Sequence, residues 1–152
     1  HALAAEAPRQ VNLFIWGEYL APDTLSSFEQ KTGIKVVVDH FDSLETVETK
    51  LLTGRSGYDL VLTAGQHLQR AIKSGALQPL DKTALPHFAG LDSEFTGHMA
   101  AFDPDNRYAG LYVWGTTGIG YQQQAIAKRM ADAPTDSWAM LLDPVVVAKF
   151  AD

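Results

Sequence analysis

Two aromatic side chains and a carboxylate lie close together near the start of the chain. Trp16, Glu18 and Tyr19 follow an almost uninterrupted apolar run that begins at Val11. Aromatic faces attract cations and a carboxylate pairs with them directly, so this trio has the chemistry to bind an amine or another small cation. The alternative is structural: Trp16 belongs to the core and Glu18 is a solvated loop residue. Both interpretations stay open on these residues alone.

The sequence shows little of the chemistry that enzymes use. It has no cysteine, no Gly-x-Ser-x-Gly motif, and no two histidines at the i, i+4 spacing of a helical zinc site. His40 and Asp42 flank Phe41 and would share one face of a strand, which is more typical of a solvated edge than of a catalytic pair. Gly115–Gly120 is rich in glycine but lacks the lysine of a phosphate loop. We therefore predict no enzyme, no metal site and no cofactor.

The elements that position these residues alternate in type. The run from Val11 to Tyr19 predicts a strand buried on both faces, as in a parallel sheet, and Gly17 ends it. Asp42, with Glu45 three residues later, has the logic of a capping box at the start of a helix. The predicted order after the first strand is a helix over 22–32, a strand over 34–41, a helix over 42–54, a strand over 58–63 and a helix over 66–74.

Such an alternation indicates an α/β fold with a mostly parallel, doubly wound sheet. The carboxyl ends of parallel strands meet at one edge, where ligands bind in open α/β sheets. Trp16–Tyr19, Phe41–Ser43 and Thr63–Gln66 should therefore gather around one crevice. The last two of these segments also open helices, whose free N–H groups would point into the crevice.

The chain is less regular after residue 75. Prolines and glycines predict a loop with a short helix over 76–96. Tyr112 and Trp114 could face a ligand or belong to the core, and we expect the core for one of the two. The further predicted elements are strands over 108–114 and 117–121 and helices over 122–130, 137–142 and 145–150.

Composition sets broad limits on the class of protein. The chain has 152 residues, 46% hydrophobic and 20% charged, which are globular values. A formal net charge of −6 argues against a nucleic-acid partner, because phosphates need a basic surface. Ala2–Ala5 resembles the small-residue end of a signal peptide, so residues 1–10 are expected to be a signal remnant or a disordered tail.

These residues and motifs carry a resemblance to a known family. The chain resembles the N-terminal half of the periplasmic polyamine-binding proteins, the putrescine/spermidine receptors of ABC transporters. The resemblance includes F-I-W-G-E-Y-L-A-P-D-T-L (14–25), F-D-S-L-E-T-V-E-T-K-L (41–51), D-P-D-N-R-Y-A (103–109) and W-G-T-T-G-I-G-Y (114–121), and extends over nearly all of the chain from about residue 11.

The resemblance implies a fold of the periplasmic-binding-protein-like type II class, with two α/β lobes closing on a small cationic solute. It also implies a periplasmic location, an ABC permease as partner and no catalysis. Trp16 and Tyr19 match aromatics that sandwich the polyamine, and Glu18 matches an acidic position near an ammonium group. With the crevice geometry, this gives the predicted ligand-binding residues: Trp16, Gly17, Glu18, Tyr19, Asp42, Ala64 and Gln66.

Several positions depart from the family pattern. Gly17 stands where members often have Ser or Thr, Ala64 and Gln66 stand where serines are usual, His67 replaces an aromatic, and Leu111 replaces a common Pro. Lost hydroxyls leave fewer hydrogen bonds for a terminal amine, and a protonated His67 would repel a cation. A receptor of the same fold for another amine or an amino acid is therefore the first alternative.

Length is a second departure, because family members have roughly twice as many residues. We expect residues 11–121 to form an incomplete first lobe and residues 122–152 to be the hinge crossing and the start of a second lobe. A truncated fragment of this kind would self-associate, or form an exchanged dimer, through exposed apolar residues: Trp138, Leu141, Leu142, Val145 and Val146.

Overall fold

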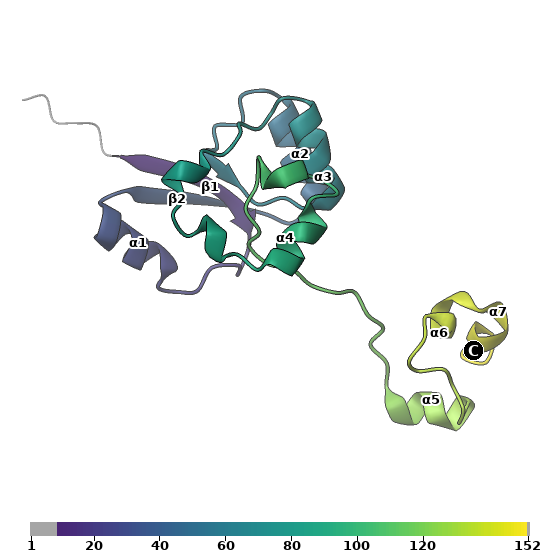
Figure 1. Cartoon of the computed structure of the whole chain (residues 1–152). Coiled ribbons are helices and arrows are strands. Elements are labelled where there is room, and N and C mark those ends of the chain that lie inside the picture. The colour runs from purple at the N-terminus through teal and green to yellow at the C-terminus, as the bar shows by residue number, and fades with distance from the viewer. Residues whose placement is uncertain (1–8, 152) are drawn as a thin grey trace, which may run out of the picture. The chain divides into compact units, whose positions relative to one another are not determined.

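A computed structural model describes residues 9–151 (Figure 1). Contacts divide the chain into two compact units, one ending at Tyr112 and the other beginning at Val113. None of the described helices is long and apolar enough to cross a membrane. Of the predicted tail over 1–10, residues 1–8 lie outside the described residues and Gln10 opens the first strand. The main elements of the first unit are β1 (Gln10–Trp16), α1 (Thr24–Thr32), β2 (Lys35–Phe41), α2 (Leu44–Leu52), β3 (Leu60–Val61), α3 (Gly65–Lys73) and α4 (Ser93–Met99).

The three strands form a parallel sheet in the order β2-β1-β3. The register pairs Trp16 with Phe41, so β1 and β2 finish side by side. β3 pairs with β1 through Leu60 and Val61 only, and is shorter than the predicted strand over 58–63. The prediction of a parallel α/β sheet is confirmed.

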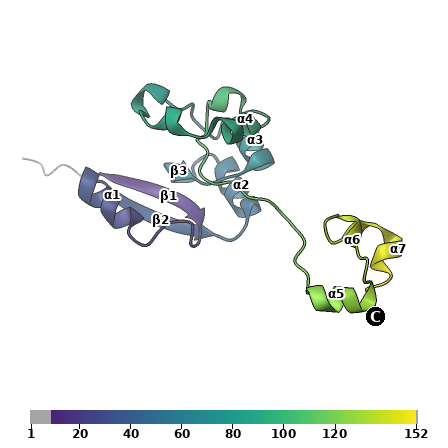
Figure 2. The same ribbon diagram turned by 60° about the horizontal axis from the view of Figure 1, so that its bottom comes forward.

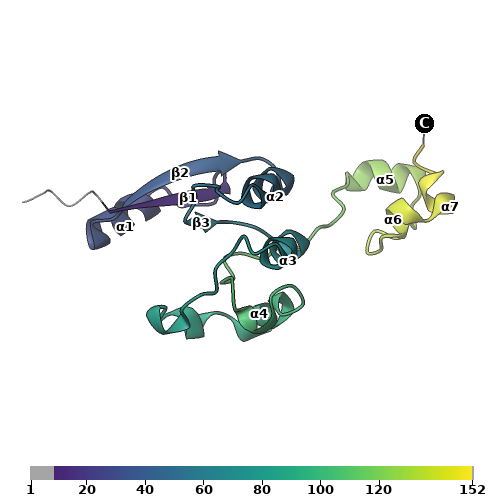
Figure 3. The same cartoon turned by 90° about the horizontal axis from the view of Figure 1, so that it is seen from above.

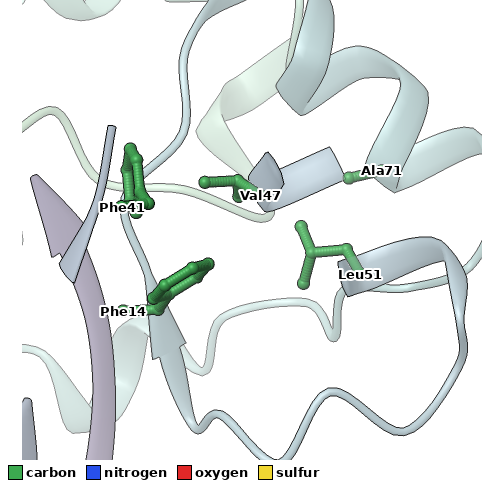
Figure 4. Close-up of a cluster of buried hydrophobic side chains, with 5 residues drawn as sticks. All are labelled: Phe14, Phe41, Val47, Leu51 and Ala71. Carbon is green, nitrogen blue, oxygen red and sulfur yellow. The ribbon is translucent and has the colours of Figure 1, made fainter. Parts of the chain in front are cut away.

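Helices pack against the sheet through a small apolar core. Phe14 of β1 and Phe41 of β2 are almost fully buried against Val47 and Leu51 of α2 and Ala71 of α3 (Figure 4). Burying such side chains contributes roughly 1.5–3 kcal/mol each for the large ones. α2 and α3 therefore pack on the face of the sheet from which Phe14 and Phe41 project.

α1 contributes differently, because none of its residues is buried. It lies along β2, away from α2 and α3 (Figure 1). The Glu29 carboxylate accepts the backbone N–H of Val36 at 2.9 Å, which occupies a donor on the outer edge of β2. The helix ends at Gly33, whose φ of 68° is a left-handed conformation that glycine adopts without steric cost.

The capping prediction for α2 is wrong by one residue. Ser43, not Asp42, precedes the first helical residue, and its hydroxyl accepts the N–H of Thr46 at 3.2 Å. A capping side chain must stand directly before the first helical turn, and Asp42 lies one position too early, directly after β2. The Asp42 side chain is exposed.

The chain after α3 is irregular, with three short 3-10 turns η1 (Lys82–Ala84), η2 (Phe88–Gly90) and η3 (Pro104–Asn106) around α4. α4 lies on the side of α3 away from β2 (Figures 2 and 3). The predicted strands over 108–114 and 117–121 are wrong: both segments are irregular, because neither finds a partner strand among the described residues. The core prediction also fails for both aromatics, since Tyr112 is 53% and Trp114 60% exposed.

The second unit contains three short helices: α5 (Gln123–Arg129), α6 (Ala139–Leu142) and α7 (Pro144–Val147). They confirm the three predicted helices of this part, with the last two shorter than expected. Met140 is buried, and the Arg129 guanidinium donates to the carbonyl of Phe150 at 2.6 Å. Exposed apolar side chains gather on α6 and α7, with Leu142 at 74% and Val145 at 72%.

Candidate functional site

An aromatic corner occupies the end of β1. Trp16 is the last residue of the strand, and its ring lies 4.8 Å from that of Phe41, the last residue of β2. The Tyr19 ring lies 6.5 Å from the Trp16 ring and is tilted by 36°. Trp16 packs against the core and is only partly buried, whereas Tyr19 is 44% exposed. Trp16 thus supports the core and also leaves part of its side chain exposed at this corner.

The turn between the two rings exposes the predicted carboxylate. Gly17 and Glu18 are both exposed, and Glu18 has a φ of 63°, a left-handed conformation that side chains other than glycine adopt at a cost. An exposed carboxylate on a turn that also carries two aromatic side chains is suited to a small cation that keeps part of its hydration.

A residue that the sequence did not place in the site reaches this turn. The hydroxyl of Tyr112 donates a hydrogen bond to the backbone carbonyl of Tyr19, with an oxygen–oxygen distance of 2.5 Å. The two residues are 93 positions apart, so no local pattern could have paired them. The signal in the sequence was the aromatic residue at position 112, for which both a ligand-facing and a core position had been left open.

The remaining predicted residues lie at the neighbouring strand ends. Asp42 directly follows β2, while Ala64 and Gln66 are exposed at the start of α3. Ala64 has no polar side chain with which to cap the helix, and its carbonyl accepts the N–H of His67 at 3.0 Å. Within residues 9–151, no hydrogen bond or ring contact joins these three residues to Trp16 or Tyr19. A ring contact therefore joins Trp16 to Tyr19, whereas the three residues at the neighbouring strand ends make no such contact in the described chain.

Thr63 is a second residue that the sequence did not select. It lies between β3 and α3, and its hydroxyl oxygen is buried without a hydrogen-bond partner in the described structure. A buried polar group of this kind costs about 1–3 kcal/mol, which a hydrogen bond would recover. Thr63 belongs to the segment 63–66 that the sequence predicted at the crevice. It was not among the predicted ligand-binding residues, because its burial depends on packing that no local pattern shows.

A groove of about 620 Å³ runs beside β3. Its walls are mainly apolar, and the one charged side chain that lines it, Asp59, accepts the backbone N–H of Asn12 at 2.8 Å. The groove thus offers an ammonium group a single carboxylate, one oxygen of which already accepts a backbone N–H. The aromatic corner is therefore the better candidate for a cation, although Leu20 and Tyr112 adjoin the groove as well.

An ion-pair cluster joins α2 to α3 near the start of α3. The guanidinium of Arg70 forms two hydrogen bonds to the Glu48 carboxylate, and the Nδ1 atom of His67 lies 2.8 Å from it. The Arg70 hydrogen bonds, helped by His67, lower the pKa of Glu48 to about 2. The His67 ring thus faces a carboxylate that is also paired with Arg70. No group of three metal-binding side chains occurs in the described part of the chain.

The fold and this strand-end site define a class of protein. The family model for the bacterial extracellular solute-binding proteins matches residues 24–150, and the chain belongs to that family. Among its relatives, the putrescine-binding periplasmic protein PotF of Escherichia coli is 46% identical over 143 residues, covering 93% of this chain and 38% of the relative. The putrescine/agmatine-binding protein of Pseudomonas aeruginosa is 46% identical over 136 residues, covering 89% of this chain and 37% of the relative.

Solved structures agree with the family assignment. A spermidine/putrescine ABC transporter protein from Listeria monocytogenes superimposes with a TM-score of 0.74 at 34% identity, covering 90% of this chain and 41% of that one. The predicted periplasmic-binding-protein-like fold and the family resemblance are confirmed. The chain spans less than half the length of each of these relatives.

Proposed function

We propose that this chain forms part of a receptor that captures putrescine or a related polyamine. The observation that carries the proposal is the turn at the carboxyl end of the central strand, where the exposed residue Glu18 stands in the sequence between Trp16 and Tyr19, whose rings lie 6.5 Å apart. Relatives named for putrescine binding, at 46% identity, support the same ligand class. The receptor would bind its solute without converting it.

In this proposal, one ammonium group of the polyamine pairs with Glu18, and its methylene chain lies along the aromatic faces. A cation–π contact contributes about 0.5–2 kcal/mol, depending on how far it is desolvated. The backbone at Gly17, the Asp42 carboxylate and the helix start at Ala64 and Gln66 would line the rest of this side of the site. We propose residues 11–121 as the first lobe and residues 122–152 as the crossing toward a second, which would supply the opposite wall.

The location and partners follow from the ligand class. We propose that the receptor works in the periplasm and delivers its solute to an ABC permease, as the names of the relatives suggest. A receptor for a different amine or for an amino acid is the competing proposal, because Ala64 and Gln66 offer no hydroxyl group to a terminal amine.

The proposal can be tested by titrating the purified chain with putrescine, spermidine and lysine in a calorimeter. We expect saturable binding of a polyamine that weakens roughly tenfold in Trp16→Leu, which removes the π face but keeps an apolar side chain against Phe41. Trp138→Leu, an exposed tryptophan of the second unit, is the matched control and should bind as the wild type does. Preferential binding of lysine would support the competing receptor, and no heat with any of the three would contradict both.

A second candidate function, self-association, rests on the apolar side chains of α6 and α7. Trp138, Leu141, Leu142 and Val145 are all between 49% and 74% exposed. Apolar patches of this kind are commonly covered by another protein surface. Native mass spectrometry tests this directly: a dimer that Leu142→Glu converts to a monomer would support it, and a wild-type monomer at high protein concentration would exclude it.

A further inference from the structure

Tyr112 lies where the first unit ends and contacts the turn that carries the proposed amine site. It is the last residue of the unit, and its hydroxyl donates to the carbonyl oxygen of Tyr19 at 2.5 Å. Tyr19 directly follows Glu18, the residue held in a left-handed conformation. The hydrogen bond therefore acts at the point where the backbone leaves that strained turn.

The segment that leads to Tyr112 is firmly held at its start. The Asp103 side chain is buried, and its two carboxylate oxygens accept the N–H groups of Arg107, Tyr108 and Ala109 at 2.9–3.0 Å. The carbonyl of Arg107 accepts the N–H of Leu80 at 2.8 Å. A carboxylate with three backbone donors fixes the chain direction over these residues, so Tyr112 projects from an anchored segment only three residues further on.

The turn itself has few other anchors. Gly17, Glu18 and Tyr19 are exposed, and the ring of Tyr19 contacts only Trp16 among the ring pairs of residues 9–151. An exposed turn with a strained residue samples other conformations unless a distant group holds it. Among the described side chains, the Tyr112 hydroxyl is the one that bonds to the Tyr19 backbone.

We infer that Tyr112 is a positioning residue of the amine site, which holds the Gly17–Tyr19 turn in its binding conformation from the point where the chain leaves the first unit. This inference rests on the proposed function for the identity of the ligand. The predicted contact is with the protein backbone and not with the solute. Because coupling is reciprocal, a solute that engages Tyr19 also stabilises the Tyr112 segment.

The test separates positioning from ligand contact by using Trp16 as a reporter. In a background carrying Trp114→Phe and Trp138→Phe, Trp16 is the single tryptophan. We expect Tyr112→Phe, which removes only the hydroxyl, to raise acrylamide quenching of Trp16 about twofold without ligand, as the turn loosens. Putrescine affinity should fall about threefold to tenfold, the equivalent of one exposed hydrogen bond.

Tyr108→Phe is the matched control, because it removes a hydroxyl from the same segment and leaves the Tyr19 carbonyl bonded. It should change neither quenching nor affinity, and both variants should unfold at the same urea concentration. Equal quenching in the two variants would overturn the inference. A loss of affinity without a change in quenching would also overturn it, since it would assign the hydroxyl to the solute. If the wild type binds no polyamine, the proposed function fails while the quenching of Trp16 still decides the role of Tyr112.

Discussion

At the scale of single residues, the site is small and its parts are separable. Trp16 is shared between the core and the exposed corner, so a change there affects stability as well as binding. Glu18 is exposed. Its carboxylate is therefore the part of the site that can be changed with least effect on folding.

Replacing Glu18 by glutamine should weaken putrescine binding about tenfold, because the ammonium group loses its charged partner but keeps a hydrogen-bond acceptor. Calorimetric titration measures the change. Glu94→Gln, an exposed carboxylate on α4, is the control and should leave the affinity unchanged. Equal affinity in the two variants would show that Glu18 does not face the solute.

Replacing Glu18 by glycine should weaken binding as the glutamine variant does, but should also raise the free energy of unfolding by up to about 1 kcal/mol. Glycine adopts a φ of 63° without steric cost. The stability gained by removing this strain exceeds the stability lost because glycine has a greater conformational entropy in the unfolded chain. Urea denaturation of the two variants compares the effects. A glycine variant less stable than the glutamine variant would mean that the turn carries no strain.

At the scale of elements, the periodic and capped segments were predictable and the pairing of isolated segments was not. The apolar run through Phe14, the Gly33 stop and the helical stripe containing Val47 and Leu51 are local signals, and the structure places these elements as expected. Segments 108–114 and 117–121 have strand-like composition, but a strand exists only where a partner offers its backbone groups. The contact of Tyr112 with Tyr19 was likewise beyond prediction, because it depends on how Asp103 directs the chain.

The N-terminus of α2 offers a direct test of the corrected cap. Ser43→Ala should lower the free energy of unfolding by about 1 kcal/mol, because it removes the acceptor for the N–H of Thr46. Asp42→Ala should have little effect on stability and should instead weaken polyamine binding. Chemical denaturation at neutral pH measures the stability of both variants, and calorimetric titration measures their polyamine binding. A larger loss of stability in the Asp42 variant would favour the cap that we had first predicted.

The link between α2 and α3 should depend on pH. The pKa of Glu48 is lowered to about 2, chiefly by Arg70, so its ion pair stabilises the fold fully above the ordinary pKa of about 4.5. This contribution decreases as the pH falls through that window toward 2. The difference in urea midpoint between wild type and Glu48→Gln should therefore be large at pH 6 and shrink at pH 2.5. A difference that stays constant over this range would show that the charge of Glu48 contributes nothing.

At the scale of the whole molecule, the division after Tyr112 separates the sheet from three short helices. Val113, Trp114 and Tyr121 are all exposed and lie in a segment without regular structure. The sequence predicted regular strands there, and the family resemblance predicted the fold more reliably than those strand signals did. The match to PotF covers 38% of the length of that relative.

Limited digestion with chymotrypsin should therefore cut first between residues 112 and 121 and release an N-terminal fragment that contains the sheet. Exposed aromatic side chains in an irregular segment are accessible to the protease, whereas the core aromatics Phe14 and Phe41 are not. Mass spectrometry of the early products identifies the sites. A first cut inside β1 or α2 would contradict the division into two units.

The two edges of the sheet differ in their tendency to aggregate. On the β2 side, Glu29 of α1 occupies the Val36 N–H, and charged Lys35 and Asp39 also discourage a second chain from adding there. On the β3 side, Leu60 is 57% exposed beside an apolar groove, and no element of the described chain pairs with that edge. Strand-to-strand polymerisation of this chain would therefore begin at β3. Leu60→Lys would place a charge at that edge, which opposes the addition of a second chain and keeps concentrated samples in solution.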